Sequence, residues 1–355
     1  MNLWSRIADV LLRTVAPIVL ALLAGAVVLA VLGADPLAFY RDVVTLGLLG
    51  DGWQHTLAAM APLLLVALGL IVAFRAQLWN LGYSGSFLLA AAVTAGISPA
   101  LFASLPFGLA LVIALVAAAS VGALLGFVPA LLKVWRGTNE VVTSLMMSFI
   151  AMGVANLLVR GPWQDPAVSV PQTRVLDLAN MLPFVPGTRV HVGLVLALVA
   201  VVVVQLMLNH TAFGLRVDVM GANPAAALHA GINVRGMTIA IFLISGGLFA
   251  LAAAVDMLGQ WGYMRAGWNP GYGDKILPFV FLARLSPIAS VPLVGVYAVL
   301  ATGGTIAAGR AGISVDVLLV LVALVLVFML LIEVLGTKLR LGVSYLPRGL
   351  FGGAR

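Results

Sequence analysis

The chain contains no cysteine, and only 9% of its residues are charged. The missing cysteine excludes disulfide bonds, thiolate metal sites and a cysteine nucleophile. The low charge separates the chain from soluble domains, in which about 25% of residues are charged. Because 63% of the 355 residues are hydrophobic, too little polar surface remains to cover a water-soluble fold. Lipid is therefore expected to be the main solvent of this protein.

Catalytic and nucleotide-binding signatures are also missing. The sequence contains no GxxxxGK[ST], no GxSxG and no HExxH pattern. Its four histidines have no second ligand at helical spacing, so we expect neither a metal site nor catalytic residues. The net charge is +7, but the basic residues form no cluster with aromatic residues, so nothing in the sequence indicates nucleic-acid binding. An intramembrane enzyme would need clustered polar side chains deep in its spans, and no such cluster is found.

Long apolar runs predict an all-α integral membrane protein of about ten transmembrane helices, at roughly 20 residues per span. The expected helices cover 14–32, 56–74, 80–97, 106–132, 139–159, 191–208, 237–258, 287–309 and 314–335, with a shorter tenth segment at 272–283. That tenth segment is too short to span alone at about 1.5 Å per residue, so we expect it to tilt, to break or to re-enter.

Basic residues predict the orientation of these spans. With ten crossings and a cytoplasmic N-terminus, most Lys and Arg residues fall inside, as the positive-inside bias favours. The inside set includes both termini, with Arg6, Arg13, Lys338, Arg340, Arg348 and Arg355. We therefore expect both termini in the cytoplasm.

The N-terminal run resembles a signal peptide, because Arg6 and Arg13 precede the apolar stretch 15–32 and then Gly33 and Ala34. A signal-peptide core of about 7–15 residues would be shorter than this stretch. We expect a retained first span instead.

A near-repeat breaks this apolar background. The stretch 79–85 reads WNLGYSG, and 268–273 reads WNPGYG. In the ten-span topology the first copy begins a span on the cytoplasmic side and the second on the external side. Glycine-broken segments at matching positions of two inverted halves indicate a substrate path where the repeats meet. We predict a path formed by Trp79, Asn80, Tyr83, Trp268, Asn269 and Tyr272.

These residue types have a second interpretation. Aromatic rings stack on ring-shaped solutes, and asparagine both donates and accepts hydrogen bonds. Trp and Tyr also anchor membrane interfaces, and an asparagine beside glycine often caps a broken helix. Of the ionisable groups in or near spans, Asp274 and Lys275 are expected at the mouth of the path. Asp256 and Glu333 fall near predicted span ends, where contact with solvent is expected.

The loop at 209–236 predicts a short helix between two spans. Asn223 suits an N-cap, Pro224 suits the first helical position, and Gly231 suits a C′ stop. Its small side chains allow another backbone to approach closely, so it is either a plain connector or a contact element for a cytoplasmic partner.

The same loop resembles the coupling helix of permease subunits of ATP-binding cassette (ABC) importers in the branched-chain amino acid, ribose and nucleoside permease family. That family reads roughly GENPEAARLAGI. This chain matches it at Gly221, Asn223, Pro224, Ala226, Ala227, Ala230, Gly231 and Ile232, and departs from it at Ala222, Ala225, Leu228 and His229. The stretch 138–147, TNEVVTSLMM, is similar to the family's NEVIxTLM segment. Asn80 and Gly82 match its FNIGAEGQ segment, in which Ser84 and Ser86 here replace Glu and Gln.

The resemblance implies a type II importer-like permease: one transmembrane domain over 1–355, with repeat halves at about 56–160 and 237–335 and a coupling loop at 209–236. It implies three partners: a cytoplasmic ATPase that carries ATP and Mg²⁺, a second permease subunit, and a periplasmic or lipid-anchored binding protein. The second permease would be a related shorter chain or a second copy. No cofactor is expected in this chain, and the location would be the bacterial inner membrane.

The solute is expected to be a nucleoside or purine, because the length and the long external loop look most like that branch. A ribose-type sugar is the alternative. An ion-coupled secondary transporter is a further rival, although it would have no use for a coupling helix.

Overall fold

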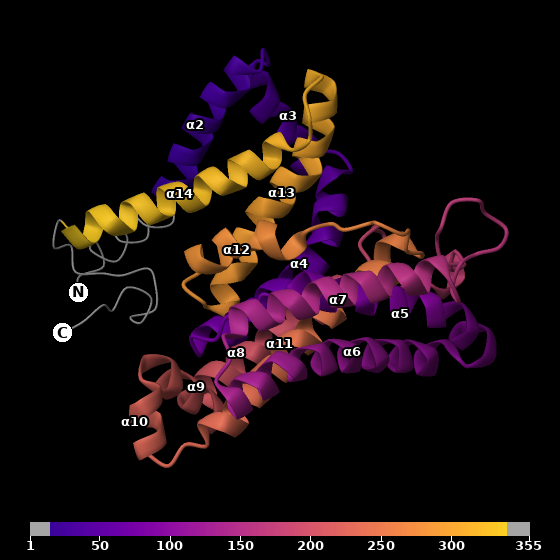
Figure 1. Ribbon diagram of the computed structural model, residues 1–355. Helices are drawn as coiled ribbons and strands as arrows, with labels where there is room; N and C mark the ends of the chain where they lie inside the picture. Colours follow the sequence, from indigo (N-terminus) through magenta and orange to yellow (C-terminus); the bar gives the residue numbers. More distant parts are fainter. Residues whose placement is uncertain (1–14, 339–355) are drawn as a thin grey trace. The chain divides into compact units, whose positions relative to one another are not determined.

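The computed structural model describes residues 15–338 and consists mainly of α-helices, joined by turns and by one long, mostly irregular segment at 161–192 (Figure 1). Arg6, Arg13, Arg340, Arg348 and Arg355, on which part of the predicted orientation depends, lie outside the described residues. The side chains of Glu333 and Lys338 lie outside them as well.

A helix occupies each of the ten predicted apolar segments. In chain order they are α2 (Ala16–Val31), α4 (Gly52–Arg75), α5 (Tyr83–Ser104), α6 (Phe107–Arg136), α7 (Glu140–Arg160), α8 (Gly193–His210), α11 (Val234–Asp256), α12 (Tyr272–Leu282), α13 (Pro287–Ala311) and α14 (Val317–Lys338). Among the described residues, seven helices are long and apolar enough to cross a membrane, or eight if the bent pair α2 and α3 forms one span.

Two helices were not predicted as separate elements. One is α3 (Pro36–Leu48), which follows α2 at an angle of 119°. It begins because Asp35 Oδ1 accepts hydrogen bonds from the backbone of Leu37 at 2.9 Å and of Ala38 at 3.3 Å. The charged pair Arg41 and Asp42 interrupts its apolar pattern, which hid it from a search for apolar runs. The other is α9 (Ala212–Ala222), which begins at an N-cap, Thr211.

The described residues divide into two compact units: Met60–Asp274, and the described parts of Met1–Ala59 and Lys275–Arg355 together. In the first unit, α11 packs against both α5 and α6. The contact with α6 is a close backbone approach. A Cβ added at Gly122 would collide with the carbonyl of Gly246, and one added at Gly126 would collide with the carbonyl of Phe242. Gly122 and Gly126 thus form a small-residue face that packs closely on α11, as such faces do between membrane helices.

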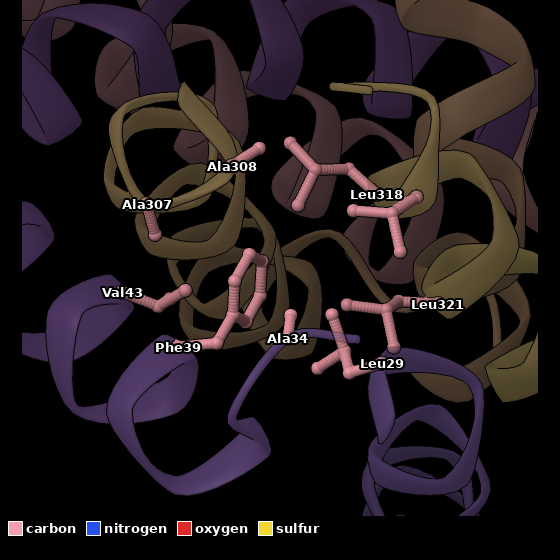
Figure 2. Packing of buried hydrophobic residues seen from close by; sticks show 9 residues of the cluster. Leu29, Ala34, Phe39, Val43, Ala307, Ala308, Leu318 and Leu321 are labelled. Atoms are coloured by element: carbon pink, nitrogen blue, oxygen red, sulfur yellow. The ribbon is translucent and has the colours of Figure 1, made fainter. Parts of the chain in front are cut away.

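In the second unit, α13 packs against α3 and α14, and α2 packs against α14. Its core joins α2 and α3 to α13 and α14, as Figure 2 shows. The buried residues of this core are Leu29, Ala34, Phe39, Val43, Ala307, Ala308, Val317, Leu318 and Leu321.

The α6–α11 contact yields a stability prediction. Gly122→Ala places a methyl group against the backbone of Gly246, which cannot rotate away. We expect a loss of about 1–3 kcal/mol, typical of overpacking, measured as a lower thermal midpoint in detergent. Gly153→Ala, in α7, is the matched control, because nothing lies within 4 Å of its added Cβ. Its midpoint should stay level or rise, and equal losses in both variants would contradict the close packing.

Candidate functional site

The two copies of the Trp-Asn-x-Gly-Tyr motif form the same local structure. Asn80 Oδ1 accepts a hydrogen bond from the backbone N–H two residues further on, at 3.1 Å. Asn269 Oδ1 does the same at 2.9 Å. A helix then begins at the tyrosine of each copy, α5 at Tyr83 and α12 at Tyr272. This shared turn supports the interpretation of the motif as a duplication.

Side-chain hydrogen bonds join the first copy to α7 and α11. Asn80 is 2% exposed, and its Nδ2 donates to Ser245 Oγ of α11 at 3.1 Å. Two serines of α7 accept hydrogen bonds from backbone N–H groups of this copy: Ser144 from Leu81 at 3.1 Å, and Ser148 from Gly85 at 2.7 Å. These bonds satisfy backbone groups that lipid would leave unpaired.

The second copy is surrounded by aromatic rings. Trp268 lies 5.3 Å from Trp261 and 6.0 Å from Phe87, measured between ring centroids. Tyr272 stands edge-on to Phe87 at 5.3 Å. Together these four rings form a continuous aromatic cluster that links α5 with the segment leading into α12.

A narrow pocket brings residues of both copies together. It is lined by Val66, Tyr83, Ser84, Phe87, Asn269, Pro270, Tyr272 and Gly273. Its volume is about 10 Å³, roughly the room that one water molecule needs, so the pocket is closed in this conformation.

Three of the six predicted path residues, Tyr83, Asn269 and Tyr272, thus share one pocket. A fourth, Trp268, borders it through Phe87. The other two lie elsewhere: Trp79 packs on Phe74 at 4.8 Å, and Asn80 lines a separate narrow pocket between α5, α6 and α7.

Both tyrosine hydroxyls donate hydrogen bonds to carboxylates: Asp274, which was expected at the mouth of the path, and Asp256, which was not assigned to it. The Tyr83 hydroxyl donates to Asp274, and the Tyr272 hydroxyl donates to Asp256 Oδ2 at 3.2 Å. The expected contact of Asp256 with solvent was wrong, since this residue is 0% exposed. The reason is that the helix does not end there, because α11 continues into a π-helical turn, Met257–Trp261. The available signal was an acidic residue inside a predicted apolar span, 237–258.

The short helix predicted after Asn223 is present as α10 (Pro224–His229). Asn223 Oδ1 accepts hydrogen bonds from the N–H groups of Ala225 at 3.0 Å and Ala226 at 3.1 Å. Gly231 ends the turn with a φ of +77°. Ala227 is buried on the protein, whereas Pro224, Ala225, Ala226, Leu228 and His229 are exposed. The helix therefore presents a surface of mostly small side chains, and it lies with α9 at one end of its unit (Figure 1).

Arg75, the last residue of α4, forms hydrogen bonds with the loop 209–236 that carries α10. Arg75 donates from Nε to Asp218 Oδ1 at 2.6 Å and from Nη2 to Oδ2 at 3.0 Å. Its Nη1 donates to Asn209 at the end of α8, at 2.6 Å. Gly221 packs directly on the carbonyl of Arg75, where a Cβ would collide. The loop that carries α10 is thus anchored a few residues before the first motif copy at Trp79.

Comparison with known proteins identifies the family. Residues 54–334 match the model of the family described as branched-chain amino acid transport system / permease component. The chain belongs to this family. It is accordingly a multi-pass membrane protein and the permease component of an ABC transporter, and it is not itself catalytic.

Curated relatives of this permease cover most of its length. It is 32% identical to the glucose ABC transporter permease protein TsgB13 of Haloferax volcanii, over 93% of this chain and 89% of the relative. It is 26% identical to the guanosine ABC transporter permease protein NupP of Bacillus subtilis, over 91% and 94%. It is also 26% identical to the nucleoside ABC transporter permease protein NupB of Lactococcus lactis, over 81% of each. No solved structure matches the permease significantly.

The two asparagines yield a paired prediction. Asn80→Ala removes two hydrogen bonds at a buried site and leaves polar groups unpaired, so we expect a loss of about 1–3 kcal/mol of stability. Asn269→Ala removes one bond from an exposed turn and should cost less than about 1 kcal/mol. Thermal midpoints in detergent compare the two variants. A larger loss at Asn269 would contradict the structural role assigned to Asn80.

Proposed function

We propose that this permease moves a small, ring-bearing polar solute into the cytoplasm, and that the solute is a nucleoside or purine. The pocket shared by the two motif copies supports this most directly. Its Phe87 and Tyr272 rings offer stacking surfaces, and Asn269 and Ser84 offer donors and acceptors. The guanosine and nucleoside relatives, each 26% identical, agree with this solute class.

A simple sugar is the second candidate. The 32% identity to a glucose permease favours it, and sugar rings also pack on aromatic side chains. Both candidates would place a ring with polar hydrogen-bonding groups between Tyr83 and Tyr272.

The architecture that goes with this function has about ten spans arranged as an inverted repeat. With the bent pair α2 and α3 counted as one span, eight spans are identified by length, and α12 and α14 would be the remaining two crossings, tilted or supported by neighbouring helices. The permease would be one transmembrane domain in the bacterial inner membrane, with both termini in the cytoplasm. Halves at about 56–160 and 237–335 would flank the coupling loop 209–236.

The transporter would contain three further kinds of chain: a cytoplasmic ATPase, a binding protein on the outer side, and a second permease. Bacillus subtilis and Haloferax volcanii each hold another permease similar to this chain, at 28% and 27% identity. Such pairs support a related second subunit rather than two copies of one chain.

We infer that α10 receives the force of ATP binding and hydrolysis from the ATPase. Its exposed small side chains permit close docking, and Arg75 connects its loop to α4. Gly221, Asn223, Pro224, Ala226, Ala227 and Gly231 would form this coupling element. Movement of the element would expose the pathway alternately to each side. An ion-coupled transporter, by contrast, would not need this element.

A charge on α10 tests the coupling. Ala226→Glu adds a bulky anion to the exposed face of α10, so we expect solute uptake by cells to fall to background while the protein still inserts in the membrane. Ala103→Glu, at an exposed alanine one residue before the end of α5, is the matched control and should keep uptake near the level of the unchanged protein. Normal uptake by the Ala226 variant would contradict the docking role.

The solute itself is identified through the binding protein. We expect the binding protein co-purified with the complete transporter to carry a nucleoside or purine, detected by mass spectrometry of the released small molecule. Excess unlabelled guanosine should then suppress uptake, and excess glucose should not. The reverse pattern of competition would select the sugar, and competition by neither would reject both candidates.

A further inference from the structure

Two tyrosine hydroxyls connect the helices that frame the shared pocket. Tyr83, the first residue of α5, bonds to Asp274 in the first turn of α12. Tyr272, the first residue of α12, bonds to Asp256 at the end of α11. Three elements are thereby joined through two side-chain hydrogen bonds, and both tyrosines also line the pocket.

Asp256 is an unusual partner. It is completely buried within a span, and its Oδ1 has no hydrogen-bond partner. No ion pair joins it to a basic side chain in the part of the chain from 15 to 338. An acidic group in such surroundings is expensive and in membrane proteins usually serves the function. Its contact with Tyr272 places it directly behind the pocket wall.

The pocket is shut where these bonds lie. Gly273, between Tyr272 and Asp274, packs so closely on the Tyr83 ring that an added Cβ would collide with it. With room for only about one water, the pocket must widen before any solute enters. Widening separates the beginning of α12 from Tyr83, from Asp256, or from both.

We propose that the Tyr83–Asp274 and Tyr272–Asp256 bonds form a latch that holds this pocket closed, and that Asp256 is a positioning residue that acts through Tyr272. The inference rests on the proposed function, in which the pocket lies on the solute pathway. When the latch opens, both tyrosine hydroxyls become available to hydroxyl or amide groups of the solute. A ring-bearing polar solute could thus replace the bonds that it breaks.

Phenylalanine substitutions isolate the hydroxyl groups. Tyr83→Phe and Tyr272→Phe keep the rings, so the edge-on contacts with Phe249 and Phe87 remain. Tyr40→Phe is the matched control. It removes the hydrogen bond that the Tyr40 hydroxyl donates to the carbonyl of Leu22 at 2.7 Å, and this site lies outside the pocket.

The absence of cysteine supplies a direct readout. Ser84→Cys introduces a single thiol into this chain, in the lining of the pocket. Its labelling rate by a charged methanethiosulfonate reagent is measured on this chain in membranes that contain the complete transporter. Each tyrosine variant is made in the Ser84→Cys background. We expect the thiol in Tyr83→Phe and in Tyr272→Phe to be labelled about 2- to 10-fold faster than in Ser84→Cys alone, which is the ratio that corresponds to the loss of one hydrogen bond. Tyr40→Phe should leave the rate unchanged.

A second set of variants separates positioning from general damage. Asp256→Leu removes the acceptor and should speed labelling as Tyr272→Phe does. The double variant Asp256→Leu with Tyr272→Phe should be no faster than either single one, because both break the same bond. Additive acceleration would overturn the role assigned to Asp256.

Unchanged rates in both tyrosine variants, acceleration in only one, or equal acceleration in Tyr40→Phe would overturn the latch. The comparison uses only protein that has inserted in the membrane. Labelling needs neither a known solute nor a working ATPase. A failed latch is therefore distinguishable from a failed transport assignment, which the uptake of the Ala226 variant tests.

Discussion

The pocket depends on one constraint, namely that backbone groups at a broken helix must find partners inside the protein when lipid surrounds it. The chain interrupts its apolar helices at two Trp-Asn-x-Gly-Tyr stretches. In each, the asparagine side chain accepts a hydrogen bond from the backbone N–H two residues further on, and a new helix begins at the tyrosine. Without these turns, neither tyrosine would be positioned at the pocket.

The two copies have the same turn but different surroundings. Around Asn80 the partners are hydroxyl groups, Ser144 and Ser148 of α7 and Ser245 of α11, and the side chain is buried. Around Asn269 they are aromatic rings, and the side chain is exposed. The first copy is therefore the fixed side of the pocket, and the second copy offers the surface on which a ring-bearing solute can stack.

The anchoring of the α10 loop has a mechanical consequence. Arg75 holds α9 and the end of α8 against the end of α4, and the chain continues from there to Trp79 and Asn80. A force applied to α10 would reach the first motif copy through this short connection. The physical basis is one bidentate ion pair and one close glycine contact, at Gly221.

Much of this arrangement was predictable from local signals. Apolar runs located the ten helices, and asparagine, proline and glycine located α10, because caps and stops act within a few residues of themselves. Other features were not predictable. The charged pair Arg41 and Asp42 interrupts the apolar run of α3, and the π-helical turn after Asp256 buried an acid that was expected in solvent. The Tyr83–Asp274 contact joins residues far apart in sequence, so only tertiary packing creates it.

The account stands on the claim that the two motif copies frame one solute pathway. The most direct test is an electron cryomicroscopy map of the complete transporter in lipid nanodiscs, trapped with its solute. The account predicts solute density between Tyr83 and Tyr272, within hydrogen-bond distance of Asn269. Density on a route that leaves these three side chains facing lipid would contradict it.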